Sequence, residues 1–107
     1  MSLDESRFAT LADDLLERIA DALEDALEDA DAELHAGILT LSVPGLGQYV
    51  INKHAPNREI WLSSPKSGAH HFAWRDETWI STRDAAISLV PLLTSEIKAI
   101  TGAELAL

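Results

Sequence analysis

The spacing of apolar residues changes once along this 107-residue chain, and that change constrains the fold more than any other feature. Before residue 30 the apolar positions recur every three or four residues, as on one face of an α-helix. They are Phe8, Leu11, Leu15, Ile19, Leu23, Ala26 and Leu27. From Ile38 onward apolar residues alternate with polar ones, as in strands that bury one face. The sequence therefore predicts a long amphipathic helix followed by β-structure.

The first helix is predicted to cover roughly residues 3–30. Ser2 followed by Glu5 matches a capping box, in which the two side chains bond each other's backbone amides. We therefore expect Ser2 to cap a helix that begins at Leu3.

Five strands are predicted after this helix, at residues 38–43, 48–53, 58–63, 70–74 and 78–81. Short segments that contain Pro, Gly or Asn separate them, for example residues 44–47 and 55–57. Because short turns join antiparallel strands, we expect a meander. The sequence therefore predicts an antiparallel sheet of five to seven strands.

A second helix is predicted to close the chain. Ser88 is a candidate N-cap and Gly102 suits the position after the last turn. The apolar face of this helix comprises Leu89, Leu92, Leu93, Ile97 and Ile100. The predicted fold is an α+β two-layer sandwich in one domain, residues 1–107, with the N- and C-terminal helices packed on one face of the sheet.

The net charge of the chain lies entirely in its first third. Residues 1–33 hold twelve of the eighteen acids and two of the eight bases, and they account for the net charge of −10. Acids stand four residues apart at Glu17 and Asp21 and again at Asp21 and Asp25, and such pairs destabilise a helix. A solubilising face is the simplest explanation. The alternative is a surface that binds a hard cation or a basic partner, because carboxylate oxygens are ligands for such cations.

Composition excludes several classes of function. The absence of Cys excludes disulfides and thiolate metal sites, and a pI near 4.6 argues against nucleic-acid binding. No apolar run is long enough to span a membrane, and no leader-like segment is evident. We therefore expect a cytosolic protein or an already processed organellar protein.

The alternation of the middle strands predicts what the open face of the sheet presents. If Ile60 and Leu62 point to the helices, Trp61 points away from them, and so does Asn52. A Trp on an open sheet face is either a binding hot spot or a cover for its own sheet. His70 and His71 are neighbours in one strand, so they point to opposite faces and are not expected to share a metal ion.

The motif N-K-x-x-P-N-x-x-I-W-L-S-S-P at residues 52–65, followed by Gly68, Trp74 and Trp79, resembles the signature of the frataxin family, whose bacterial members are called CyaY. The resemblance covers essentially the whole chain. It implies a weakly bound iron, Fe(II) or Fe(III), no organic cofactor, and a role in iron–sulfur cluster assembly. It also implies docking on the complex of cysteine desulfurase and scaffold protein, with no nucleic acid or membrane as partner. We expect a monomer that could form oligomers with iron.

The resemblance also assigns candidate site residues. The metal candidates are Asp13, Asp14, Glu17, Asp21, Glu24, Asp25, Glu28, Asp29 and Asp31, and the position of His35 near these acids adds one nitrogen ligand. The partner-binding candidates are Asn52, Lys53, Trp61, Ser63, Ser64 and Pro65. No catalytic residue is assigned. The alternatives are an iron-detoxifying ferroxidase, or an acidic interaction module whose metal binding is incidental.

Overall fold

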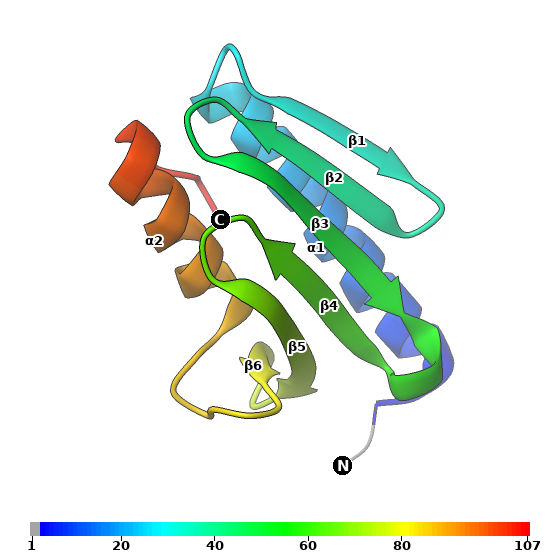
Figure 1. Cartoon of the computed structure of the whole chain (residues 1–107). Coiled ribbons are helices and arrows are strands. Elements are labelled where there is room, and N and C mark those ends of the chain that lie inside the picture. Colours follow the sequence, from blue (N-terminus) through cyan, green and yellow to red (C-terminus); the bar gives the residue numbers. More distant parts are fainter. Residues whose placement is uncertain (1–2) are drawn as a thin grey trace.

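The computed structural model describes residues 3–107, which form a six-stranded antiparallel sheet with two helices on one of its faces (Figure 1). The elements in chain order are α1 (Glu5–Ala26), β1 (Asp31–His35), β2 (Ile38–Val43), β3 (Gly47–His54), a 3₁₀ turn (Ala55–Asn57), β4 (Glu59–Ser64), β5 (Gly68–Arg75), β6 (Thr78–Ser81) and α2 (Leu89–Thr101). Each strand pairs with the next one in the chain. The predicted α+β sandwich is confirmed.

The first helix is shorter than predicted at both ends. Asp4 is the N-cap, and its side chain accepts a hydrogen bond from the Arg7 amide at 2.7 Å. The predicted cap, Ser2, lies outside the described residues. The helix ends at Ala26, and Leu27 is already extended. Acids crowd this end and the last turn has no basic residue, so the helix dipole and charge repulsion both oppose further turns.

Strand β1 is the element that the sequence analysis missed. It pairs with β2 over its whole length and forms one edge of the sheet. Four of its five side chains are exposed and only Ala32 is partly buried, so no apolar alternation marks it. Charged side chains on an edge strand are common because they discourage pairing with other chains. The other five strands lie within two residues of their predicted positions.

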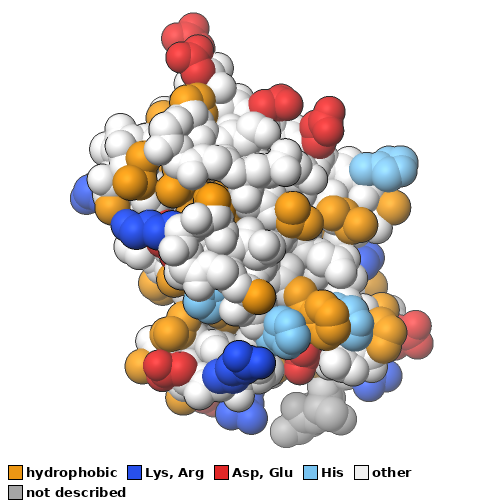
Figure 2. Space-filling model, in the orientation of Figure 1, with side chains coloured by type: hydrophobic (Ala, Val, Ile, Leu, Met, Phe, Trp, Pro, Cys, Tyr) orange, Lys and Arg blue, Asp and Glu red, His pale blue; other side chains and the backbone are white. Residues whose placement is uncertain are grey.

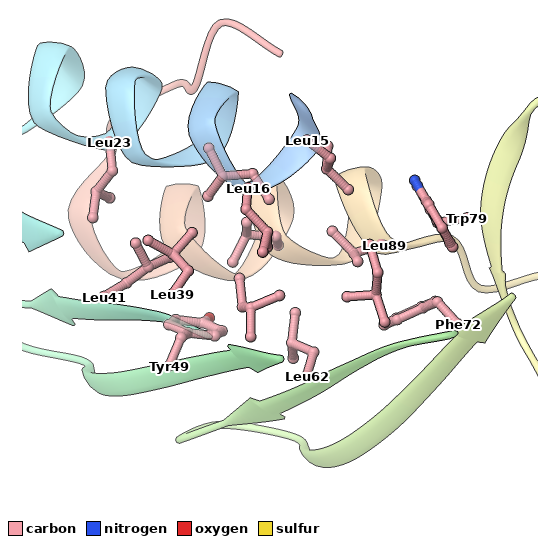
Figure 3. Packing of buried hydrophobic residues seen from close by; sticks show 14 of the residues in the cluster. Leu15, Leu16, Leu23, Leu39, Leu41, Tyr49, Leu62, Phe72, Trp79 and Leu89 are labelled. Atoms are coloured by element: carbon pink, nitrogen blue, oxygen red, sulfur yellow. The ribbon is translucent and has the colours of Figure 1, made fainter. Parts of the chain in front are cut away.

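The core lies between the helices and the inner face of the sheet. Figure 3 shows Leu16 and Leu23 of α1 and Leu89 of α2 directed towards strand residues that include Tyr49 and Phe72. All five side chains are 0% exposed. Burying one large apolar side chain stabilises a fold by about 1.5–3 kcal/mol, so this layer fixes which sheet face is covered.

Helix α2 begins and ends where predicted, although Ser88 at its N-cap makes no side-chain capping hydrogen bond. Gly102 ends it with φ +76°, and Leu89, Leu93 and Ile97 are buried as expected. Ile100, however, is 46% exposed, whereas Glu96 is only 6% exposed. Ile100 lies at the end of the helix, where the sheet no longer covers it. In residues 3–107, no helix is both long and apolar enough to cross a membrane.

Candidate binding surfaces on the first helix and the open sheet face

The ten predicted metal ligands are all exposed, but they do not form a single helical ridge. Six of them, from Asp13 to Asp25, lie on α1. Glu28 and Asp29 lie in the turn after it, and Asp31 and His35 lie on β1. The prediction of one continuous helix to residue 30 is wrong for Glu28 and Asp29, and Asp31 and His35 lie beyond the predicted helix. Their side chains are held by the turn and by the sheet edge next to α1, which gives the acidic surface two layers.

Two of these acids have cationic neighbours. Asp13 accepts a hydrogen bond from Lys53 Nζ at 2.8 Å, and Asp14 lies 3.4 Å from an Arg18 guanidinium nitrogen. Within residues 3–107, no ion pair involves the acids from Glu17 to Asp31. The uncompensated negative charge is therefore concentrated towards the C-terminal part of α1 and the following turn. Solvated carboxylates of this kind bind cations weakly and with little selectivity.

No preformed metal cage exists in the part of the chain that the structure describes. No group of three or more His, Cys, Asp or Glu side chains there is arranged to hold an ion. A cation on this surface would therefore have to gather carboxylates from successive turns of α1. The assignment of the ten residues as iron ligands stays a prediction.

The sheet face opposite the helices is open (Figure 2). Its strand register places two of the predicted partner residues, Asn52 and Trp61, side by side. Trp61 of β4 lies opposite Asn52 of β3 and His71 of β5, and Asn52 lies opposite Ile38 of β2. Tyr49, Ile51, Ile60 and Leu62 are buried on the other face. The predicted outward orientation of Trp61 and Asn52 is thus confirmed. Figure 2 shows histidine and hydrophobic side chains on this face, with acidic side chains mostly towards its margins.

Trp61 is held between two histidine rings. The centroid of its ring is 3.6 Å from that of His54 and 4.2 Å from that of His71, and each imidazole plane lies within 10° of the indole plane. Its Nε1 donates a hydrogen bond to Glu59 at 2.8 Å. Both faces of the indole are therefore covered by the protein itself, and the side chain is half-buried. The result is a rigid aromatic stack at the centre of the open face, with the edges of three rings available for contact.

The remaining partner candidates divide into two groups. Ser63 and Pro65 are exposed, at the end of β4 and in the loop that follows. Lys53 points to α1, where it pairs with Asp13. Ser64 is 6% exposed, and its hydroxyl bonds Glu96 and accepts from the amides of Lys66 and Ser67. Ser64 therefore anchors the β4–β5 loop, and its side chain is not presented to solvent.

Glu96 is a buried charged residue that the sequence analysis did not identify. Its carboxylate accepts hydrogen bonds from Tyr49 Oη and Ser64 Oγ, both at 2.6 Å, and from Ser67 Oγ. Burial by itself would raise the pKa of Glu96, but the hydrogen bonds from Ser64, Ser67 and Tyr49 outweigh it and lower the pKa below its ordinary value. Burial and the adjacent Glu96 carboxylate raise the pKa of Tyr49. The network joins α2, β3 and the β4–β5 loop.

Comparison with known proteins agrees with this arrangement. The family model described as the frataxin-like domain matches residues 1–103. The chain belongs to this family. It is 38% identical over 103 residues to the mitochondrial frataxin homolog of Saccharomyces cerevisiae, a match that covers 92% of this chain and 59% of the yeast protein. It is 34% identical over 80 residues to the iron–sulfur cluster assembly protein CyaY of Neisseria meningitidis, covering 75% of this chain and 74% of that protein.

A solved structure of the same family shares the fold of this frataxin-like chain. The crystal structure of trimeric frataxin from Saccharomyces cerevisiae, complexed with ferrous iron, superposes with a TM-score of 0.72 at 35% identity. The match covers 92% of this chain and 87% of the yeast chain. The chain spans about three fifths of the full length of the yeast relative.

Proposed function

We propose that this frataxin-like protein is an iron-binding accessory protein of iron–sulfur cluster assembly. It binds iron weakly on the exposed carboxylates of α1 and of the turn after it, and it docks on the complex of cysteine desulfurase and scaffold protein. The observation that carries the proposal is the separation of two exposed surfaces, one acidic and one centred on Trp61. A bacterial relative named as a cluster assembly protein and a yeast relative crystallised with ferrous iron support it.

The iron-binding part of the proposal rests on unpaired carboxylates at helical spacing. Glu17, Asp21 and Asp25 follow one another at four-residue steps and none of them forms an ion pair within residues 3–107. A cation placed between two successive acids relieves their repulsion and gains hard oxygen ligands. Since the carboxylates are exposed, water competes for the ion, and the protein would exchange iron readily rather than store it.

The docking part rests on the open sheet face. Its central Trp61 is pre-ordered by the stack with His54 and His71, so little side-chain entropy is lost when a partner covers it. The exposed Ile38 and Val50 extend the apolar surface along β2 and β3. A pre-ordered Trp surrounded by smaller apolar and polar groups has the composition of an interface hot spot.

An accessory role is favoured over a ferroxidase because of where the carboxylates point. They are exposed and spread over α1, the turn after it and β1, whereas iron-oxidising carboxylate proteins hold two metal ions between inward-facing side chains of a bundle. We further propose that the protein works as a monomer that can associate when iron is bound, in the bacterial cytoplasm or in the mitochondrial matrix.

The proposal is tested by reversing charge on α1. The double variant Asp21→Lys/Asp25→Lys should lose anaerobic Fe(II) binding in calorimetry and should also bind the desulfurase–scaffold complex more weakly. Asp76→Lys/Glu77→Lys makes the same change in net charge at the β5–β6 turn, and it should change neither property. Loss of partner binding alone would favour a pure interaction module. Retention of both activities in the α1 variant would overturn the proposal.

A further inference from the structure

The loop between β4 and β5, residues 65–67, is exposed but is tied to a buried carboxylate of α2. Figure 1 shows this loop beside α2. The loop continues from Ser63, which lies two residues after Trp61 and therefore on the same, open face of the sheet. We propose that Glu96 of α2 is a positioning residue for docking, which holds the loop in the conformation that a partner contacts beside Trp61. This inference rests on the docking function proposed above.

Ser64 connects Glu96 to the backbone of the loop. Its hydroxyl donates to Glu96 Oε1 at 2.6 Å and accepts from the amides of Lys66 and Ser67, both at 3.0 Å. A hydroxyl has one hydrogen and two lone pairs, so these three bonds use all of its hydrogen-bonding capacity. Because the hydrogen of Ser64 is directed to Glu96, its lone pairs face the two loop amides. The carboxylate therefore sets the orientation of the group that holds the loop.

Two further contacts fix the loop. Ser67 Oγ donates to the second carboxylate oxygen of Glu96, Oε2. Pro65 packs so closely on Gly47 of β3 that a Cβ at Gly47 would lie 2.9 Å from the Cβ of Pro65. Gly47 has φ +129°, a conformation that favours glycine. Each of the three loop residues is thus tied to the fold, although each of them is exposed.

Glu96 and Ser64 are not placed to contact a partner themselves. Each residue is 6% exposed, and Glu96 belongs to a helix on the covered side of the sheet. Any effect that they have on docking must therefore pass through the loop. A loop held in one conformation loses little conformational entropy when a partner covers it, whereas a free loop must be ordered by the partner at a cost in affinity.

The test compares Ser64→Ala with Tyr49→Phe. Ser64 and Tyr49 donate to the same oxygen, Glu96 Oε1, at the same distance of 2.6 Å, but only Ser64 also holds the loop amides. Biolayer interferometry measures affinity for the desulfurase–scaffold complex, and urea unfolding measures stability. Ser64→Ala should bind the complex about tenfold more weakly, because the complex must then order the loop. Tyr49→Phe should also be less stable but should bind as the wild type does.

Ser67→Ala is the second variant, for the case that Ser64→Ala does not fold. It removes the bond to Glu96 Oε2 and the contact with His70, and it should weaken binding by up to about fivefold. Hydrogen exchange reports the state of the loop directly. The amide of Lys66 should exchange faster in both serine variants and at the wild-type rate in Tyr49→Phe.

The outcomes separate this inference from the docking function on which it rests. If the folded serine variants bind as the wild type does, or if Tyr49→Phe weakens binding as much as they do, Glu96 does not position the loop for docking. If Trp61→Ala still weakens binding in that case, the docking function stands without this inference. If Trp61→Ala binds as the wild type does, docking through the open face is itself wrong.

Discussion

The ammonium group of Lys53 on β3 lies 2.8 Å from the carboxylate of Asp13 on α1, so a predicted partner contact and a predicted metal ligand neutralise each other. The Lys53 amide also donates to the Gly37 carbonyl at 2.8 Å, which fixes the base of the side chain. The Lys53 side chain is 24% exposed, and that of Asp13 is 51% exposed. A cation that binds Asp13 must therefore displace this ammonium group.

We predict that Lys53→Met strengthens divalent-cation binding at the N-terminal half of α1 by up to about fivefold, because removal of a competing charge near Asp13 releases roughly 1 kcal/mol in water. The unfolding free energy should fall by less than about 1 kcal/mol, since the Asp13 carboxylate is half exposed to water. Calorimetry with Mn(II) measures the first effect and urea unfolding the second. Lys98→Met on α2, which breaks the ion pair with Glu104 in the C-terminal segment, is the control and should leave cation binding unchanged.

Neutralising a central acid of α1 should stabilise the fold while it weakens cation binding. Asp21→Asn removes repulsion with Glu17 and with Asp25, so the unfolding free energy should rise by about 0.5–1 kcal/mol and the Tm by about 2–6 °C. Asp14→Asn breaks the pair with Arg18 and should not raise the Tm. Thermal denaturation followed by circular dichroism measures both. A lower Tm for Asp21→Asn would mean that Asp21 has a stabilising contact.

Glu96 should make an acid-sensitive contribution to stability. Because the pKa of Glu96 is lower in the folded protein than in the unfolded chain, its stabilisation is present above the unfolded pKa of about 4.3. It is lost as the pH falls through the folded pKa. Glu96→Gln should therefore cost about 2 kcal/mol at neutral pH, and the difference from the wild type should shrink below about pH 4. Urea unfolding at pH 7, 5 and 3.5 measures the difference in unfolding free energy between the wild type and Glu96→Gln. A difference that grows on acidification would contradict this account.

Trp61→Ala should weaken binding to the desulfurase–scaffold complex by about thirtyfold or more, as expected for a hot-spot residue at the centre of an interface. Trp74→Ala is the matched control, because Trp74 packs against Trp79 at the β5–β6 end of the sheet. Both variants lose aromatic contacts. A loss of affinity that occurs only in Trp61→Ala therefore reports docking, and a loss that occurs in both reports lower stability. Biolayer interferometry with the immobilised complex gives the affinities, and equal effects of the two substitutions would argue against docking through the open face.

Apolar periodicity was sufficient to predict most of the fold. Strands β2 to β6 were predicted because each buries one face, and Trp61 was placed outward because Ile60 and Leu62 had to point inward. Strand β1 was missed because it is an edge strand with almost no buried side chain. The end of α1 was predicted too late because Leu27 continues the apolar stripe, although the local charges oppose another turn.

The candidate site was only partly predictable for a different reason. Exposed acids and an outward Trp follow from local spacing alone. The Lys53–Asp13 pair joins residues 40 positions apart, and the Tyr49–Glu96 bond joins residues 47 apart. Such contacts depend on how the helices sit on the sheet. The one local hint was that Glu96 lies on the same helix face as Leu89 and Leu93, where a buried carboxylate requires partners.

The most direct test of the central claim is an anaerobic NMR titration of the ¹⁵N-labelled protein with Fe(II), followed by addition of the desulfurase–scaffold complex. The account predicts that iron broadens or shifts amides of α1 and of residues 27–31, strongest from Glu17 onward. It predicts that the complex then also affects Asn52, Trp61 and His71 on the open face. If Fe(II) leaves the amides of α1 unchanged, the acidic surface does not bind iron and the proposed function is wrong.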